Sequence, residues 1–150
     1  MMKRTKSAIV AATLITIGIS MIALAVSQHW TFGNGGKVNV SGVEVYWDAA
    51  KTNSCTYINW SAISPTGSFF PGDSKTVTLY LYNPGSVTGM LSITYTGWNP
   101  SHAGSFLTHS WSPNVGSLLA GELVQTNLTL TVLASVNFTS FNYNINLDMA

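Results

Sequence analysis

The sequence predicts an all-β fold, a single antiparallel Ig-like or jelly-roll β-sandwich of about 7–8 strands that follows one N-terminal hydrophobic helix. Three observations lead to this fold class. Most of the chain after residue 28 alternates apolar and polar residues with a period of two. Segments that contain Pro, Gly and Asn interrupt the alternation at short intervals, and no later stretch repeats its apolar residues at helical spacing. Short strands joined by tight turns are typical of antiparallel sandwiches.

The alternation locates the expected strands. Within residues 76–82, Val77, Leu79 and Leu81 occupy one face, and Thr and Tyr residues occupy the other. This pattern is typical of a strand with one buried and one solvated face. The same alternation predicts strands at 43–47, 56–60, 91–95, 128–132 and 141–147. The turn signals fall at 65–67, 71–73, 83–85, 99–100, 112–114 and 120–121.

Two of these corners resemble each other. Residues 70–81 and 119–130 each contain an apolar residue, a Gly turn followed by an acidic residue, and then a strand. We expect them to be equivalent positions at which the chain enters a sheet. The acidic residues, Asp73 and Glu122, are interpreted as caps of local backbone N–H groups rather than as a catalytic pair.

Residues 7–26 form an uncharged, apolar stretch directly after Lys3, Arg4 and Lys6. A stretch of this length can span a bilayer as one helix, and the basic residues would keep its start in the cytoplasm. The sequence therefore predicts that the chain beyond residue 28 is exported to the cell surface or the extracellular space.

The fate of this segment stays open. Residues 1–28 are either a signal peptide, cleaved after a small residue such as Ala25, or a retained transmembrane anchor. Trp30 suits the membrane–water interface of an anchor. A third alternative is cleavage close to Ala8, as in a prepilin, which would leave the apolar helix for a filament core.

Residues 29–37 contain Gly33, Gly35 and Gly36 and are predicted to be a Gly-rich linker. Residues 38–150 then form the sandwich, one domain of common size. From residue 29 onward the chain has three Lys, no Arg and five acidic residues. Because it lacks the basic patch that neutralises phosphates, we expect no nucleic-acid partner.

No catalytic residue, cofactor or metal site is predicted, and the chain is expected not to be an enzyme. It has no recognisable nucleophile, phosphate-binding or zinc motif. The histidines lack the close spacing of metal ligands, although His102 and His109 flank one expected hairpin. The single cysteine, Cys55, is interpreted as a buried apolar residue, with an interchain bridge or lipid attachment as the alternative.

Asparagine sequons of the form N-x-[ST] mark candidate glycosylation sites at Asn39, Asn59, Asn127 and Asn137. Asn59 and Asn127 are out of phase with the apolar residues beside them, so both should face solvent. Asn137 shares the phase of Phe141, so it faces outward only if a bulge or turn intervenes.

The chain has five tryptophans. Trp47 and Trp60 lie in the buried phase of their strands and are predicted to be core residues. Trp98 and Trp111 border turns, where an exposed ring could stack on a sugar or contact a partner. Packing within the core or against a loop is the other interpretation of this pair.

The stretch from Phe70 to Ser86 resembles the P-G-x-S, strand, N-x-G corner of Ig-like adhesion and cell-surface modules. Together with residues 45–48, 94–100 and 139–146, the region 37–149 resembles small exported β-sandwich proteins of archaea. Some of those proteins build extracellular threads or bundling pili, in which an N-terminal strand of one subunit completes the sandwich of the next. The resemblance implies an Ig-like surface protein and self-association through a strand.

We therefore expect a non-enzymatic structural protein of the cell surface that contacts copies of itself or other surface proteins. In its filament form, residues 37–47 are a donor strand. The pocket-filling side chains of that strand would be Val38, Val40, Val43 and Val45. One alternative is a carbohydrate-binding or adhesion module that uses Trp98 and Trp111. Another is an accessory subunit of an envelope machine, anchored in the membrane by residues 7–26.

Overall fold

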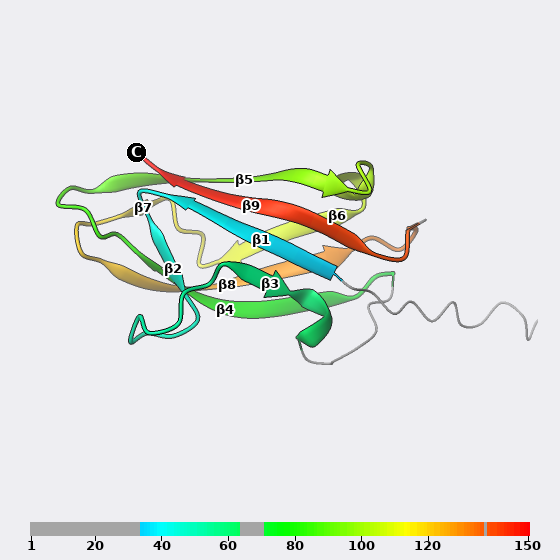
Figure 1. Ribbon diagram of the computed structural model, residues 1–150, viewed down its shortest axis with the longest axis horizontal. Helices are drawn as coiled ribbons and strands as arrows, with labels where there is room; N and C mark the ends of the chain where they lie inside the picture. Colours follow the sequence, from blue (N-terminus) through cyan, green and yellow to red (C-terminus); the bar gives the residue numbers. More distant parts are fainter. Residues whose placement is uncertain (1–33, 64–70, 137) are drawn as a thin grey trace, which may run out of the picture.

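Two β-sheets pack face to face in the computed structural model, which describes residues 34–63, 71–136 and 138–150. The first sheet has the strand order β3-β1-β9-β5-β7, and the second has the order β2-β4-β8-β6 (Figure 1). The strands are β1 (Asn34–Ser41), β2 (Glu44–Tyr46), β3 (Tyr57–Asn59), β4 (Ser74–Tyr82), β5 (Gly89–Asn99), β6 (Leu107–Ser112), β7 (Ser117–Leu118), β8 (Leu123–Val132) and β9 (Phe141–Met149). Two short 3-10 helices are η2 (Trp60–Ala62) and η3 (Ala103–Ser105). The predicted all-β sandwich is confirmed.

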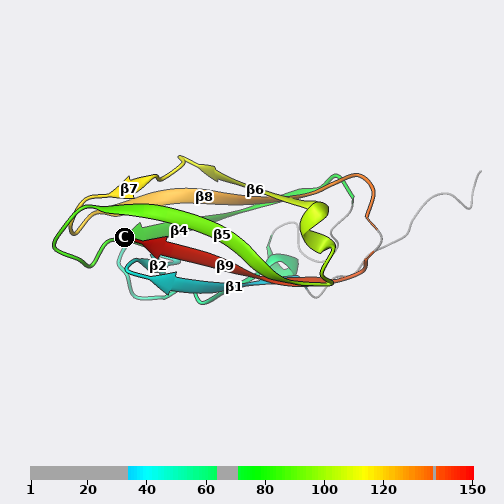
Figure 2. The ribbon, with the colours of Figure 1, turned by 90° about the horizontal axis from the view of Figure 1, so that it is seen from above.

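Each successive strand lies in the opposite sheet. The odd-numbered strands form the first sheet and the even-numbered strands form the second. Consecutive strands are therefore not hydrogen-bonded neighbours, and the chain crosses between the layers at every connection (Figures 1 and 2). The expected hairpin between His102 and His109 is wrong for this reason, because β5 and β6 belong to different sheets.

One pair of strands also departs from the expected antiparallel arrangement. All eight residues of β1 pair in parallel with β9, from Asn34 opposite Phe141 to Ser41 opposite Asp148. A parallel pair requires a long crossover connection, and here nearly the whole domain lies between the two strands. The first and last described strands are consequently neighbours inside one sheet.

The core lies between the middle strands of the two sheets. Leu79 and Leu81 of β4 and Leu128 and Leu130 of β8 are at most 1% exposed. Ile145 of β9 faces them from the first sheet with the same low exposure. Among the expected core tryptophans, Trp60 is fully buried, whereas Trp47 is half-buried at the edge of the core.

The two corners that resemble each other precede the two central strands of the second sheet. These strands, β4 and β8, pair directly from Ser74 opposite Thr131 to Tyr82 opposite Leu123. In both turns the Gly has a positive φ, 92° at Gly72 and 71° at Gly121. Glu122 accepts a hydrogen bond from the Leu119 backbone N–H at 2.6 Å, so the expected capping role is confirmed for that residue.

The expected linker ends earlier than residue 37, because β1 already begins at Asn34. A Cβ atom at Gly36 would lie 3.0 Å from Cδ1 of Ile145, and the ring of Tyr57 covers Gly35. Gly35 and Gly36 are therefore needed because the neighbouring side chains approach the β1 backbone closely, and not because the segment must be flexible. The rest of the linker and the N-terminal segment 1–28, where the sequence predicts a hydrophobic helix, lie outside the described residues. Within the ranges that are described, the helices are too short and too polar to span a bilayer.

Candidate functional site

Along each of the two long sides of the sandwich, an edge of the first sheet faces an edge of the second sheet. The side formed by β5 and β6 is called the open side below. On the open side, β5 pairs with the short strand β7 through Gly89 and Met90, and Leu91 donates a hydrogen bond to the carbonyl oxygen of Gly116. Beyond Leu91, the outer edge of β5 meets no further strand in the described part of the chain. The facing strand, β6, is likewise the last strand of its sheet. Backbone N–H and C=O groups on such edges are available to pair with another strand.

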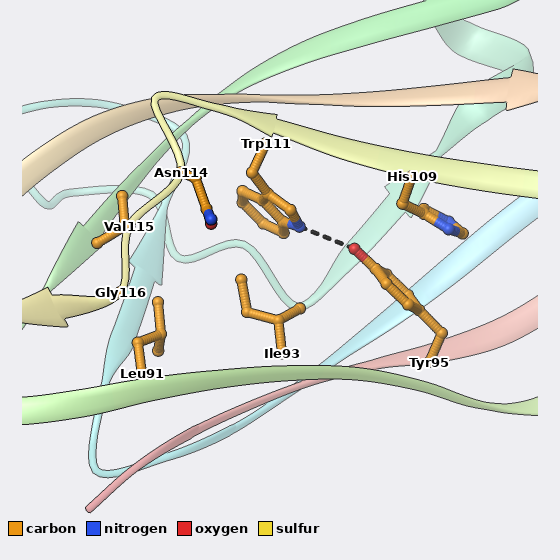
Figure 3. A pocket seen from close by; sticks show the side chains of 8 residues that line it. All are labelled: Leu91, Ile93, Tyr95, His109, Trp111, Asn114, Val115 and Gly116. Carbon is orange, nitrogen blue, oxygen red and sulfur yellow. Dashed lines mark hydrogen bonds between the residues drawn. The ribbon is translucent and has the colours of Figure 1, made fainter.

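A groove with a volume of about 330 Å³ lies between these two edges (Figure 3). Leu91, Ile93 and Tyr95 enter it from β5 at two-residue spacing, and Trp111 enters it from β6. The remaining lining residues are His109, Asn114, Val115 and Gly116. The inward-facing side chains of β5 are all half-buried after Gly89, unlike those of the middle strands. The core is thus incompletely covered along this side.

The inner end of the groove is fixed by a hydrogen-bonded aromatic cluster. Trp111 donates its indole N–H to the hydroxyl oxygen of Tyr95 at 2.8 Å. The Tyr95 ring stacks on His109, with centroids 3.8 Å apart and planes 14° apart. Deeper in the core, Nε2 of His109 lies 2.9 Å from the Tyr143 hydroxyl, which also accepts a hydrogen bond from Nε1–H of Trp60. The cluster therefore ties β5, β6, β9 and η2 together.

This arrangement assigns the proton of the His109 ring. Burial raises the pKa of Tyr143, so its hydroxyl stays protonated and has one proton to donate. Because the Trp60 N–H is only a donor, Nε2 of a neutral His109 is the one of these two partners that can accept the hydroxyl proton, and we adopt this tautomer. His109 is then neutral, with its own proton on Nδ1. Burial lowers the pKa of His109 to about 4, which agrees with a neutral ring.

The opposite side of the sandwich, called the closed side below, is bridged by the chain itself and keeps a pocket of about 260 Å³ whose lining includes Val38, Val45 and Cys55. Residues 54–56 pass between the sheets: Cys55 donates its N–H to the carbonyl of Val45 at 2.8 Å, and Val38 donates to the carbonyl of Thr56 at 3.0 Å. Cys55 is 3% exposed, and burial raises the pKa of its thiol to about 12. The interpretation of Cys55 as a buried apolar residue is confirmed.

The expected donor segment, residues 37–47, takes part in this closed side of its own sandwich. Val38, Val43 and Val45 are buried in the core, and only Val40 is largely exposed, at 49%. β1 pairs with β9 and β3, and β2 pairs with β4. Val38, Val43 and Val45 therefore fill pockets of their own domain in this structure. The alternation that suits a donated strand also suits an ordinary strand.

The two candidate contact tryptophans have different surroundings. Trp98 stacks on Tyr143, with centroids 4.5 Å apart and planes 12° apart, and its indole lies close to Gly104. Trp111 borders the groove, where the exposed Asn114 lies near it (Figure 3). The structure thus places both rings in the same aromatic region but leaves only Trp111 at the groove surface.

The asparagines of the sequons differ in their exposure. Asn59 is exposed at the end of β3, whereas Asn39 and Asn127 are half-buried within longer strands. Asn137 lies outside the described residues. No group of three His, Cys, Asp or Glu side chains with the geometry of a metal site occurs in the ranges 34–63, 71–136 and 138–150. The two described histidines are in different places, His102 against Phe106 and Phe138 and His109 in the groove.

Sequence reasoning identified Leu91, Ile93 and Tyr95 as one strand face, but it missed the groove to which they belong. The missing information is that β6 lies opposite β5 in the other sheet. The alternation of Leu107, His109 and Trp111 is the local signal that could have revealed β6. The chain matches no protein-family model and no curated protein sequence.

Proposed function

We propose that this chain is a non-enzymatic, exported structural protein of the cell surface, and that its copies associate by adding a strand to the open side of the sandwich. The observation that carries the proposal is the groove between β5 and β6, with half-buried apolar side chains and an available backbone edge on each strand. An extended segment bound there would cover apolar surface and pair with a strand edge at once, which is how strand addition achieves affinity.

The donor in this proposal is the segment directly before β1. Val38, Val43 and Val45 are buried in their own core, so they are less suited to leave it than residues upstream of Asn34. In that upstream segment Trp30 and Phe32 alternate with Thr31 and Gly33. Two large apolar side chains at two-residue spacing match the spacing of Leu91, Ile93 and Tyr95 along β5.

The positions of the two ends favour a head-to-tail arrangement. β1 starts at the end of the sandwich that carries η3, and the C-terminus lies at the other end (Figure 1). The part of the groove formed by Leu91 and Gly116 lies toward the C-terminal end, since β5 starts there. A donor segment leaving one copy can thus enter the groove of the next. Such a contact is heterologous, and repeated contacts of this kind build a filament.

The proposal also includes the type of β-sandwich and the compartment of the protein. The strict alternation of strands between sheets favours the jelly-roll form of the expected Ig-like or jelly-roll sandwich. The apolar segment 7–26 and its preceding basic residues support export. Cleavage after Ala25 or Ser27 would release the donor segment, whereas a retained helix would tether it. N-terminal sequencing of the mature protein distinguishes the two.

Cross-linking between copies tests the docking. One protein carries Phe32→Cys and a second carries Asn114→Cys, and Cys55 stays unreactive in both because it is buried. Mixing them under oxidising conditions should give a disulfide-linked heterodimer. Thr31→Cys, in the opposite phase of the donor, is the matched control and should cross-link much less.

A charge in the groove gives a second test. Ile93→Lys should abolish oligomers in sedimentation velocity and filaments in electron microscopy. Ser92→Lys, on the outward face of the same strand, should leave both unchanged. The thermal unfolding of each variant reports whether it is folded. Folded Ile93→Lys protein that assembles like the original chain would refute the proposal.

Carbohydrate binding in the same groove is the second candidate function. It is favoured by Trp111 and Asn114, which offer a ring and an amide side by side (Figure 3). In this case Trp111→Ala and Asn114→Ala would each abolish binding on a glycan array and leave the oligomeric state unchanged.

A further inference from the structure

The three sequons within the described ranges differ in how hydrogen bonds and neighbouring strands hold their asparagine. An N-linked oligosaccharide is attached to the Nδ2 atom of asparagine, and its acceptor must lie at the surface. In β1, Nδ2 of Asn39 donates a hydrogen bond to Oδ1 of Asn146 at 2.9 Å, and Nδ2 of Asn146 donates in turn to Thr96. A sugar on Asn39 would replace one of the two hydrogens of Nδ2, beside the other side chains of this cross-strand network.

Asn127 is held inside the second sheet. It lies in β8 between β4 and β6, opposite Thr78 on one side and Ser112 on the other. Its Oδ1 accepts a hydrogen bond from the Thr78 hydroxyl at 2.9 Å. The hydroxyl of Thr129, the third residue of this sequon, lies 2.7 Å from the hydroxyl of Thr76. The whole acceptor sequence is therefore fixed in a central strand with neighbours about 4.8 Å away on both sides.

Asn59 lies outside the inner strands, although its sequon is also held at one atom, because the Ser61 hydroxyl accepts a hydrogen bond from the Asn34 N–H at 3.2 Å. Asn59 is the last residue of β3, the outermost strand of the first sheet, and its side chain is exposed. Its Oδ1 accepts a hydrogen bond from the Ser61 N–H at 3.2 Å and so caps η2. Its Nδ2 makes no hydrogen bond within the described part of the chain. The chain leaves the sheet at this residue, so the acceptor sequence lies at a turn.

We propose that Asn59 carries an N-linked oligosaccharide and that Asn39 and Asn127 do not. The proposal rests on the export of the chain, because N-glycosylation requires it. Asn59 belongs to β3, on the closed side of the sandwich, and the docking groove lies on the opposite side between β5 and β6. An oligosaccharide at Asn59 is therefore compatible with strand addition in the groove, and it would shield the edge of β3 from pairing with another copy.

A purified oligosaccharyltransferase and its lipid-linked oligosaccharide test the geometric part without any need for export. The substrate is the full chain with an added C-terminal tag that contains a further sequon, which reports that the enzyme is active. Glycopeptide mass spectrometry then measures occupancy among molecules whose tag is modified. In folded protein, occupancy at Asn59 should exceed that at Asn127 or Asn39 by at least about tenfold, because the inner strands must open first and tenfold corresponds to about 1.4 kcal/mol. In urea-unfolded protein that difference should disappear.

The same mass spectrometry on protein isolated from the cells that naturally make it tests occupancy itself. Modified Asn59 with unmodified Asn39 and Asn127 is the expected result. Unmodified Asn59 in that protein, or equal occupancy of Asn127 in the folded enzymatic reaction, would overturn the proposal. Asn59→Gln and Ser61→Ala should both remove the glycopeptide, and Asn127→Gln should leave it unchanged. The disulfide test of the groove does not depend on any sugar, so the two proposals can fail separately.

Discussion

The neutral, buried state of His109 should make this protein lose stability in mild acid. In the folded chain, burial lowers the pKa of His109 from its usual 6.5 to about 4. Between these two values the unfolded chain binds a proton that the folded chain does not bind. The free energy of unfolding therefore falls as the pH decreases from 6.5 to 4, and the stabilisation is complete only above 6.5.

The size of this effect follows from the two pKa values. One pKa unit corresponds to about 1.4 kcal/mol, so a decrease from 6.5 to about 4 corresponds to about 3 kcal/mol. His109 keeps some contact with solvent at the groove, which reduces the expected effect to about 2 kcal/mol. That is a large share of the total stability of a domain of this size.

The assay is urea unfolding followed by tryptophan fluorescence at pH 7.5 and at pH 4. The comparison protein is His109→Gln, whose side-chain carbonyl can still accept the hydrogen bond from Tyr143. Other titrating groups, such as Asp48, are present in both proteins, so their contribution cancels in the difference. The original chain should lose about 2 kcal/mol more than His109→Gln between the two pH values. Equal losses would refute the assignment of a neutral buried imidazole.

Three further predictions concern the backbone, the thiol and the core. Gly42 and Gly121 both have φ of 71°, but a Cβ at Gly42 would lie 2.5 Å from a backbone oxygen of β9, whereas nothing lies within 4 Å at Gly121. Gly121→Ala should cost about 1 kcal/mol in urea unfolding, and Gly42→Ala should cost about 1–3 kcal/mol more. Cys55 should react with a thiol reagent only as fast as the chain unfolds, and rapid labelling of folded protein would contradict its burial. Leu130→Ala, fully buried, should lower the free energy of unfolding by about 2–5 kcal/mol, whereas Val87→Ala, at 72% exposure, should change it by less than about 0.5 kcal/mol.

Local patterns in the sequence were enough to predict the strand faces. Val77, Leu79 and Leu81 are buried on one side of β4, as their alternation indicates. Such a pattern depends only on whether a face is buried, so it can be read without knowing the partner strand. The turn residues were equally local, since Gly72 and Gly121 adopt the positive φ that a tight turn requires.

Which strands pair with one another cannot be read from a short stretch of sequence. In this chain the local patterns led to wrong expectations about pairing. β1 and β9 come from opposite ends of the described chain, and no short-range signal distinguishes their parallel pairing from an antiparallel one. Gly35 and Gly36 suggested a linker because glycine occurs both in flexible segments and where strands approach closely. The groove was missed for the same reason, because it exists only where β5 and β6 face each other across the two sheets.

The edge strands on the two sides of the sandwich differ in length, and this difference supports the proposed association. On the closed side, residues 54–56 bridge the two sheets beside a pocket of about 260 Å³, and β3 is only three residues long. A short edge strand is one of the ways in which proteins prevent unwanted pairing. On the other side β5 has eleven residues, its outer edge lacks a strand partner among the described residues beyond Leu91, and the side chains behind it are half-buried.

A chain with so few charges has little electrostatic repulsion to keep such an edge apart from its neighbours. An exposed edge of this kind favours aggregation unless it is covered. In the proposed assembly, the segment before β1 of a neighbouring copy covers it.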